Sequence, residues 1–379
     1  MRHGTCLNDG IWNFALQSSH SHTPELDADR AKLEPFVHSS FLSSHCASSK
    51  QHSSAISTTP GSLEIIGSLR KFKMVLYIIG LGLGDEKDIT VRGLELVKSS
   101  DHVFLEAYTS ILGGVPKERL EEFYGKEITV ADRGMCENEA DDLIIAPAKE
   151  KKVSFLVVGD PVCATTHTDL IIRAKEVGVQ VEMVHNASIM GAAGACGLQL
   201  YNFGHTVSIP FFDDNWRPTS FYPKIKYNRA GGMHSLCLLD IKVKEPDFQA
   251  MMKGKTEFLP PRYMSVSRAA EQLIEAEEKH GEGIYDPSKT LCVGLARMGQ
   301  PTQKMVAGTL EELKDVDMGD PLHSMIICGE LHDLELEILK PYLIEGSTFD
   351  MSSHEPRNVY QTATSADDDD NEENDDENQ

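Results

Sequence analysis

The stretch VVGDPVCATTHTDL, Val157 to Leu170, decides the fold expected for this chain. Apolar β-branched residues run into a Gly-Asp-Pro turn and then into a Thr-Thr-His cluster, which is how a buried strand delivers polar groups to the carboxyl edge of a sheet. We therefore predict a central strand over Val153 to Val158, and we expect ligand at the turn that follows the strand.

The segments before this strand alternate between strand and helix patterns. Val75 to Ile79 is a continuous apolar run, the pattern of a strand covered on both faces, and Gly80 to Gly84 turns it toward a helix that starts near Thr90. Further strands are expected at Val103 to Leu105 and at Ile128 to Val130. This alternation predicts an α/β fold with a mainly parallel sheet and helices on both faces.

The composition changes to small residues between Ala187 and Ala195, and we place a domain boundary there. The strands expected after it are Val207 to Ile209, Ser235 to Ile241, Leu291 to Ala296, Lys304 to Ala307 and Met325 to Cys328. The helices expected after it are Pro218 to Arg229, Ser267 to Lys279 and Leu310 to Lys314. Thr309 and Glu312 form a T-x-x-E capping box that fixes the start of the last helix.

The two ends of the chain differ from the middle. Residues 1–73 are Ser- and His-rich without periodicity, so they cannot bury enough apolar area to offset the entropy of ordering. Their scattered histidines lack metal-ligand spacing. We therefore predict four segments: a disordered extension over 1–73, two α/β domains over 74–187 and 188–345, and a disordered acidic tail over 346–379.

The charge and hydropathy of the chain exclude several classes of protein. Nine of the acidic residues behind the net charge of −23 lie in residues 367–377, which leaves −14 for the rest. An acidic body repels phosphate and no basic stripe with interleaved aromatic residues is present, so we expect no direct nucleic-acid binding. No apolar run approaches the ~18 to 20 residues of a membrane helix, and no secretory signal precedes the first strand. We expect a cytoplasmic protein.

The eight cysteines form no CxxC pair and show no metal-ligand pairing with nearby histidines. We therefore expect reduced thiols and no metal site. Cys237, Cys292 and Cys328 lie within apolar strands and are predicted to be core residues.

The glycine loop after the first strand is a candidate ligand site. Glycines allow positive φ and close backbone approach, so adenosine or the methionine end of a cofactor can lie on Gly80 to Gly84. A dinucleotide-binding turn is the alternative, since Glu106 follows the second strand at about the expected distance. The spacing GxGxG differs from GxGxxG, however, and the polar run Asp85 to Asp88 separates the glycines from the next helix. Both features disfavour dinucleotide binding.

The polar residues of the central turn admit two interpretations each. Asp160 can accept hydrogen bonds from ribose hydroxyls or an ammonium group, or it can cap the turn. His167 and its neighbouring threonines can position a substrate, or Thr166 or Thr168 can cap the following helix. His323 precedes an apolar strand and is either a ligand contact or a satisfied structural histidine.

Further motifs, in a fixed order, extend the pattern of the central turn. They are YIIGLGLGD (Tyr77 to Asp85), HNASIMGAAGACGLQLYNFG (His185 to Gly204), CLLDIKV, PPRYMS, CVGLARMG and PLHSMIICG. With these motifs, the chain from Met74 to about Ile344 resembles the diphthine synthases, S-adenosylmethionine-dependent methyltransferases of the tetrapyrrole-methylase-like family.

The resemblance implies two α/β domains with the cofactor in the cleft between them, and a homodimer. It also implies S-adenosylmethionine as the methyl donor. The residues that match the cofactor-lining positions of diphthine synthases are Leu83, Asp160, Cys163, Ser188, Ile189, Leu239, Met298 and His323. Many relatives have Gly where Cys163 stands, so contact there is expected through the backbone.

The resemblance further implies the acceptor. It is the modified histidine of translation elongation factor 2, methylated three times on an amino nitrogen and once on a carboxylate. Transfer from a sulfonium requires no metal and no covalent intermediate, only a nucleophile held in line with the S–CH3 bond. We assign no catalytic base. Two alternatives stay open: a methylase acting on a porphyrin-like molecule, and a protein that binds S-adenosylmethionine without turnover.

Overall fold

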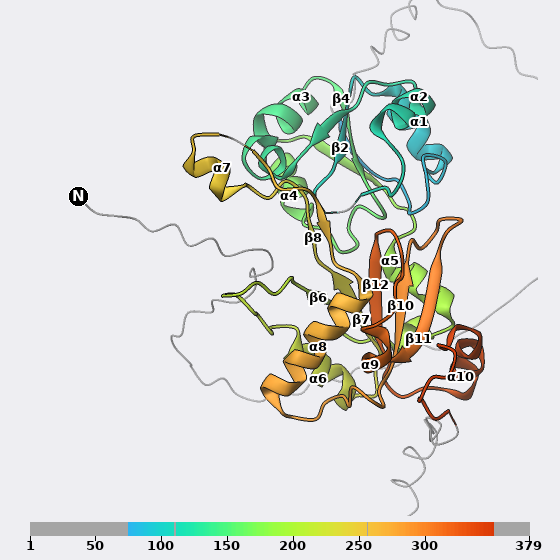
Figure 1. Ribbon diagram of the computed structural model, residues 1–379. Helices are drawn as coiled ribbons and strands as arrows, with labels where there is room; N and C mark the ends of the chain where they lie inside the picture. The colour runs from blue at the N-terminus through green and yellow to red at the C-terminus, as the bar shows by residue number, and fades with distance from the viewer. Residues whose placement is uncertain (1–74, 110, 256, 352–379) are drawn as a thin grey trace, which may run out of the picture. The chain divides into compact units, whose positions relative to one another are not determined.

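The computed structural model describes residues 75–109, 111–255 and 257–351, all of which belong to one compact unit. The predicted disorder of residues 1–73, and that of tail residues 352–379, falls outside the described residues. Residues 346–351, where the predicted disordered tail begins, are described, and Ser347 and Thr348 donate hydrogen bonds to the Glu312 carboxylate. The strands of the described part form two five-stranded sheets and one two-stranded sheet (Figure 1).

The first sheet is entirely parallel. Its strands lie in the order β3-β2-β4-β1-β5. Their bounds are β1 Val75–Gly80, β2 His102–Glu106, β3 Thr129–Ala131, β4 Lys152–Val157 and β5 Gln180–Val184. Because the strands are parallel, all five carboxyl ends meet at one edge of the sheet, where ligands bind in open α/β folds.

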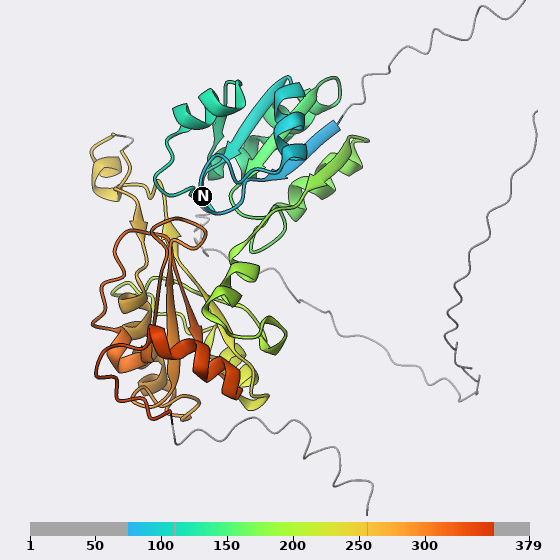
Figure 2. The same ribbon diagram turned by 90° about the vertical axis from the view of Figure 1, so that its right-hand side faces the viewer.

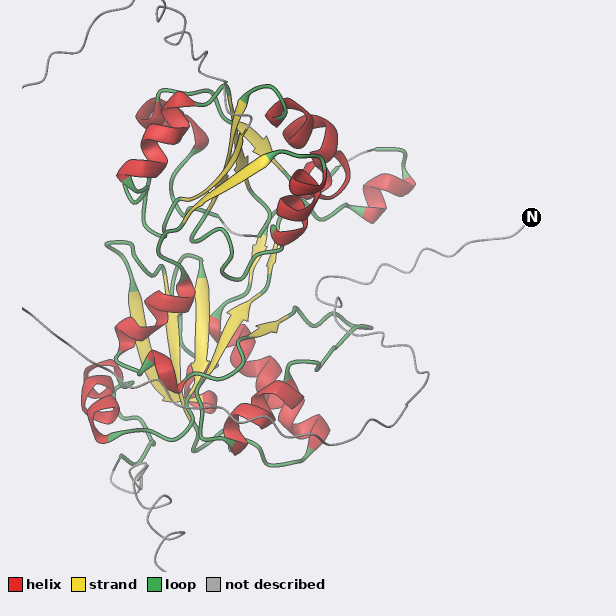
Figure 3. Ribbon diagram, turned by 180° about the vertical axis from the view of Figure 1, so that it is seen from behind, coloured by secondary structure: helices red, strands yellow, loops and turns green. Residues whose placement is uncertain are grey.

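Helices cover both faces of this sheet (Figure 3). Leu76 and Ile78 of β1 face a core that includes α4, while Val75, Tyr77 and Ile79 face a core that includes α1 and α2. This double burial explains why β1 is a continuous apolar run. The helical segments of this part are α1 Val91–Ser99, α2 Lys117–Tyr124, η1 Met135–Glu139, η2 Asp141–Ile145, α3 Ala146–Ala148 and α4 Thr168–Glu176.

The second sheet is mixed. Its order is β11-β10-β12-β7-β6, in which only β6 and β7 are parallel. The strands are β6 Val207–Ile209, β7 Ser235–Leu239, β10 Leu291–Ala296, β11 Lys304–Thr309 and β12 His323–Ile327. A short loop joins β10 to β11, a connection that antiparallel neighbours permit and parallel neighbours do not. The predicted α/β class is confirmed, and its mainly parallel sheet is the first one.

Two helical layers enclose the second sheet. One core joins the sheet to α6 and α8, and the other joins it to η3 and α10, which crosses the sheet in Figure 2. Ala193 of the small-residue segment and the nearby Cys196 are fully buried in the second of these cores. The helical segments are α5 Ile189–Ala192, η3 Ala193–Cys196, η4 Leu200–Asn202, α6 Tyr222–Ala230, α8 Val266–His280, α9 Leu310–Leu313, α10 Asp333–Leu339 and η5 Lys340–Tyr342.

A two-stranded hairpin carries a segment that we call the arm, residues 243–261. It lies between β8 (Ile241–Lys242) and β9 (Arg262–Tyr263), which are antiparallel, and it contains α7 (Phe248–Met252). The sequence prediction of one strand over Ser235 to Ile241 is wrong in this respect. The chain leaves the second sheet at Asp240, whose carboxylate accepts the backbone N–H of Phe211.

Several local predictions are confirmed. The helix after the glycine loop has Thr90 as its N-cap, and the Thr309 and Glu312 capping box is present. Cys237, Cys292 and Cys328 are buried free thiols. The domain boundary at 187/188 stays a prediction; it lies between β5, the last strand of the first sheet, and β6, the first strand of the second. No helix of the described residues is long and apolar enough to cross a membrane.

Candidate functional site

Hydrogen bonds join the loops at the carboxyl edge of the first sheet. The backbone N–H of Leu81 donates to the carbonyl of Val157 at 2.8 Å. Gly82 and Gly159 exchange two backbone hydrogen bonds, of 3.2 and 2.8 Å. The turn predicted to carry ligand therefore lies directly against the glycine loop.

The glycines of this loop are required by contacts within the chain. Gly82 has φ +78°, a conformation that favours glycine. A Cβ on Gly80 would lie 2.6 Å from the carbonyl oxygen of Gly159, and one on Gly84 would lie 2.7 Å from that of Gly299. The sequence interpretation gave these glycines to a ligand alone, whereas in the structure they also let neighbouring loops approach each other.

Asp160 is the buried carboxylate of this edge, with 4% of its surface exposed. Its Oδ1 accepts the backbone N–H of Val162 at 3.0 Å. Its Oδ2 accepts the backbone N–H of Asn186 at 3.1 Å and Nδ1 of His185 at 2.9 Å. Burial raises the pKa of Asp160, but these hydrogen bonds outweigh burial and hold it below its usual range. Since an ionised carboxylate has about four acceptor sites, one remains for a ligand donor.

Asn186 and His185 were not singled out from the sequence. The side-chain amide of Asn186 donates to the carbonyl oxygens of Gly80 at 2.9 Å and Asp88 at 3.0 Å. Asn186 thus joins the loop after β5 to the loop after β1, while His185 holds Asp160. The available signal was the polar pair directly after Val184, but strand β5 was not predicted because it is half exposed and partly polar.

Three predicted site residues lie on the same loops. Ser188 is buried, and a Cβ on Gly159 would come within 3.9 Å of its Cα. Ile189 follows it and begins α5. Cys163 lies in the loop after β4, where its backbone N–H donates to the carbonyl of Asp160 at 3.4 Å.

The other predicted site residues meet where the second sheet touches the glycine loop. Leu239 ends β7, Met298 follows β10 and His323 begins β12, and all three are buried. A Cβ on Gly299, next to Met298, would lie 2.8 Å from the Cβ of Leu83. The structure therefore brings both groups of predicted residues together through Leu83 and Gly299.

Both ring nitrogens of His323 have partners within the protein. Nδ1 accepts the backbone N–H of Val266 at 3.4 Å, so the ring hydrogen is on Nε2, which donates to the carbonyl of Asp320 at 2.9 Å. Burial lowers the pKa of His323 and keeps the ring neutral. Only its ring carbons and its backbone are left to contact a ligand.

Two sequence interpretations are settled by hydrogen bonds. Neither Thr166 nor Thr168 caps α4: the N-cap is His167, no side chain caps the helix, and the hydroxyl of Thr166 bonds that of Tyr108. The Glu106 carboxylate, which the dinucleotide alternative would give to a ribose, accepts three hydrogen bonds from its own loop and holds the turn after β2. Within the described ranges, no group of three or more His, Cys, Asp and Glu side chains is placed to hold a metal ion.

Replacing Gly84 by Ala is expected to lower the melting temperature. The added Cβ would lie 2.7 Å from the Gly299 carbonyl, a backbone atom that cannot rotate away. Overpacking of this kind costs about 1 to 3 kcal/mol, or roughly 2 to 12 °C. Gly191→Ala is the matched control for thermal unfolding, because its Cβ meets no atom within 4 Å. An unchanged melting temperature for Gly84→Ala would contradict the contact between these loops.

Comparison with known proteins identifies the family of this chain. Residues 75–314 match the family Tetrapyrrole (Corrin/Porphyrin) Methylases. Diphthine methyl ester synthase of Mus musculus is 56% identical over 277 residues, which are 72% of this chain and 98% of that protein. The diphthine methyl ester synthase of Dictyostelium discoideum is 54% identical over 273 residues, which are 72% of this chain and 99% of that protein.

A solved structure shows the same fold. The crystal structure of a diphthine synthase matches with a TM-score of 0.61 and 34% identity, over 72% of this chain and 98% of that one. The fold is that of a class of methylases. The chain belongs to the tetrapyrrole methylase family and, within it, to the family of the diphthine methyl ester synthases.

Proposed function

We propose that this protein is an S-adenosylmethionine-dependent methyltransferase of diphthamide biosynthesis. Its proposed acceptor is the aminocarboxypropyl-histidine of translation elongation factor 2. Three methyl groups pass to the amino nitrogen and one to the carboxylate, giving diphthine methyl ester. The observation that carries this proposal is the identity of 54 to 56% with diphthine methyl ester synthases across 98 to 99% of their length.

The residues at the carboxyl edge of the first sheet are suited to bind the methyl donor S-adenosylmethionine. Asp160 is an ionised, buried carboxylate with one acceptor site left, which suits a ribose hydroxyl or an ammonium group. Leu239 and Met298 supply buried apolar surface. The residues proposed to hold the donor are Leu83, Asp160, Cys163, Ser188, Ile189, Leu239, Met298 and His323.

The donor supplies a methyl group on a positively charged sulfur, and the acceptor lone pair forms the new bond while the S–C electron pair stays on sulfur. The protein side chains orient the reactants and exclude water. The apolar surface of Leu83, Leu239 and Met298 excludes water, which favours a step that discharges a cation. Asp160 stays ionised at neutral pH because its hydrogen bonds hold its pKa below the usual range. No general base is assigned.

We also propose that the protein is a homodimer that acts in the cytoplasm. The family resemblance supports the homodimer. The absence of a membrane-crossing helix among residues 75–109, 111–255 and 257–351 is compatible with a cytoplasmic site of action.

The test is methylation of a defined acceptor. The full-length protein is incubated with S-adenosylmethionine and elongation factor 2 that carries the aminocarboxypropyl-histidine. Mass spectrometry is expected to show up to four methyl groups added to that one side chain. Unmodified elongation factor 2 is the control and is expected to gain none, since its imidazole lacks the amine and the carboxylate. Equal labelling of the unmodified factor, or labelling of porphyrin precursors instead, would refute the proposed acceptor.

A further inference from the structure

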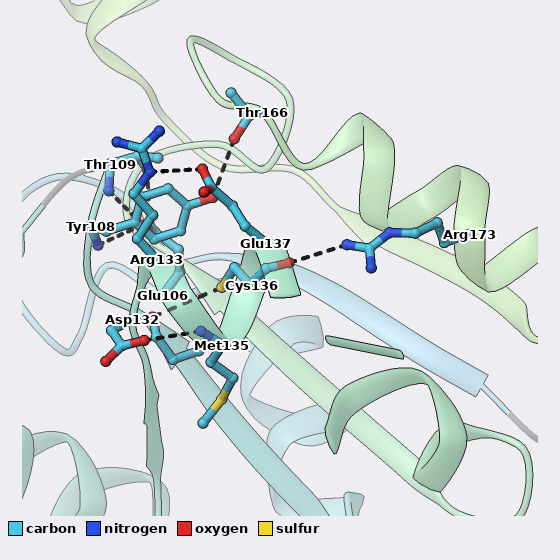
Figure 4. Close-up of polar contacts among 11 residues, drawn as sticks. Glu106, Tyr108, Thr109, Asp132, Arg133, Met135, Cys136, Glu137, Thr166 and Arg173 are labelled. Atoms are coloured by element: carbon cyan, nitrogen blue, oxygen red, sulfur yellow. Dashed lines mark hydrogen bonds and ion pairs between the residues drawn. The ribbon is translucent and has the colours of Figure 1, made fainter. Parts of the chain in front are cut away.

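The loop after β4, residues 159–167, forms hydrogen bonds with the loops that follow the strands on either side of β4. Toward β1 and β5, Asp160 accepts hydrogen bonds from His185 and Asn186. Toward β2, Oγ1 of Thr166 lies 3.2 Å from the hydroxyl of Tyr108 (Figure 4). Because the strand order is β3-β2-β4-β1-β5, this loop divides the carboxyl edge into two sides. We call the part that follows β2 and β3 the β2–β3 side.

A buried carboxylate fixes the turn that presents Tyr108. Glu106 is 1% exposed and accepts the backbone N–H of Tyr108 at 2.7 Å and that of Thr109 at 2.5 Å. The phenol is therefore held over the sheet edge (Figure 4). Burial is the main cause that raises the pKa of Tyr108 to about 12. The hydroxyl stays protonated at neutral pH, so it can both donate and accept a hydrogen bond.

The loop presents Thr166 without using it for capping. The hydroxyl of Thr165 donates to the carbonyl of Pro161 at 2.7 Å and closes the loop. Ala164 has φ +60°, a left-handed conformation that costs roughly 1 to 2 kcal/mol in a residue other than glycine. Strain of this kind is typical of functional loops. Thr166 is exposed at the end of this loop, with its hydroxyl directed to Tyr108.

A buried imidazole without a partner lies beside the hydroxyl pair. His167 is 3% exposed and lies edge-on to the rings of Phe155 and Tyr108. In the described part of the chain neither of its ring nitrogens makes a hydrogen bond of normal distance and angle, although the backbone of Pro161 lies near enough to oppose the lowering of its pKa. Burial lowers the pKa of His167 to about 4, so the ring is neutral at pH 7. A buried polar group left unpaired is unfavourable, and it is typical of a place where a bound molecule or water completes the bonding.

We propose that the β2–β3 side is the acceptor side of the methyl-transfer site, and that the hydroxyls of Tyr108 and Thr166 orient the acceptor side chain. This inference rests on the proposed function, in which donor residues take the other side of the loop. The acceptor presents an amine in three rounds and a carboxylate in the fourth. Hydroxyls suit both groups because they accept from N–H and donate to a carboxylate oxygen, whereas a fixed charge suits only one.

The arm extends the β2–β3 side outward. Lys244 at its base forms a 2.7 Å ion pair with Asp132, the residue after β3. Residues 241–263 contain five Lys and Arg against three Asp and Glu, in a chain of net charge −23. The arm exposes Met251 (51%), Met252 (89%), Phe258 (53%) and Leu259 (41%). Exposed apolar side chains beside a site are typical of a protein–protein contact. The protein that binds the arm is, in this inference, the acceptor protein itself.

Tyr108→Phe and Thr166→Val test the hydroxyl pair. Binding of elongation factor 2 carrying the precursor to the immobilised full-length protein, without donor, is expected to weaken about 3- to 10-fold in each variant, the range for one neutral hydrogen bond. Since the two hydroxyls act as a pair, the double variant is expected to bind the acceptor no more weakly than either single variant does. Calorimetric affinity for S-adenosylmethionine and the melting temperature are expected to stay unchanged, as in the control Tyr227→Phe, at a 62% exposed position on α6. Unchanged acceptor binding, or an equal loss of donor binding, overturns the inference.

Met252→Ser tests the arm. This side chain is 89% exposed, so its replacement leaves the fold intact. The KM for the protein acceptor is expected to rise severalfold, while kcat and the affinity for S-adenosylmethionine stay unchanged. Leu334→Ser, at a 62% exposed position on α10, is the matched control and is expected to change neither. A shift from dimer to monomer in Met252→Ser would assign the arm to a second copy instead. Failure of the wild-type protein to methylate any acceptor would refute the proposed function itself, so the failure of that proposal can be told apart from the failure of this inference.

Discussion

Asp160→Asn is expected to weaken S-adenosylmethionine binding by about 10- to 150-fold, the loss of a charge-assisted hydrogen bond worth about 1.5 to 3 kcal/mol. The amide of the new Asn carries no charge. Its NH2 group is a hydrogen-bond donor, and it must face at least one of the N–H groups of Val162, His185 and Asn186, which are donors too. Both the ligand bond and the loop geometry are therefore affected. Isothermal titration calorimetry with the full-length protein measures the change in affinity.

Asp101→Asn provides the matched control for this measurement. The Asp101 carboxylate also accepts a backbone N–H, that of Lys152 at 2.9 Å, but it lies at the amino end of β2 and β4. Its replacement is expected to leave donor affinity within about twofold, because a surface change away from the ligand contributes little. If Asp160→Asn bound the donor as tightly as Asp101→Asn does, the placement of the donor at this edge would be wrong.

Glu335→Gln is expected to destabilise the protein by about 1.5 to 3 kcal/mol, since it replaces a buried carboxylate that accepts several hydrogen bonds by a neutral amide that presents a donor to one of them. Glu335 is 1% exposed and accepts the backbone N–H of Gln199 at 2.8 Å and Nε2 of His234 at 3.2 Å. Because Nδ1 of His234 accepts the N–H of Gly329, the ring hydrogen is on Nε2 and points at the carboxylate. Urea denaturation measures the loss. Glu337→Gln, on the same helix but 62% exposed, is expected to change stability by less than about 0.5 kcal/mol.

The pH dependence of this difference gives a second check. Burial raises the pKa of Glu335, but the hydrogen bonds from His234, His332 and Gln199 outweigh it and hold the pKa below the usual value of 4.5. The unfolded chain therefore takes up the proton first as the pH falls. The stability contributed by Glu335 is present above pH 4.5 and is lost as the pH drops through the folded value. The difference in unfolding free energy between the wild type and Glu335→Gln is expected to be constant from neutral pH down to about 5 and to shrink below 4.5. A difference that grows on acidification would contradict the lowered pKa.

Some features of the fold and site are set by residues close together in the sequence. The apolar runs Val75 to Ile79 and Val153 to Val158 predict buried strands, and Thr90 and Thr309 mark helix starts. Asp160 is placed at the carboxyl edge by the strand that ends just before it. These predictions succeed because burial pattern, turn chemistry and capping depend on a few consecutive residues.

Only the tertiary structure decides which distant segments meet. The order β3-β2-β4-β1-β5 sets Asn186 beside the carbonyl of Gly80, and it sets Thr166 beside Tyr108. The free nitrogens of His167 and the occupied nitrogens of His323 likewise depend on what other segments bring to each ring. These contacts join residues dozens of positions apart. Their partners are chosen by the packing of whole strands and helices, which no local pattern of residue types records.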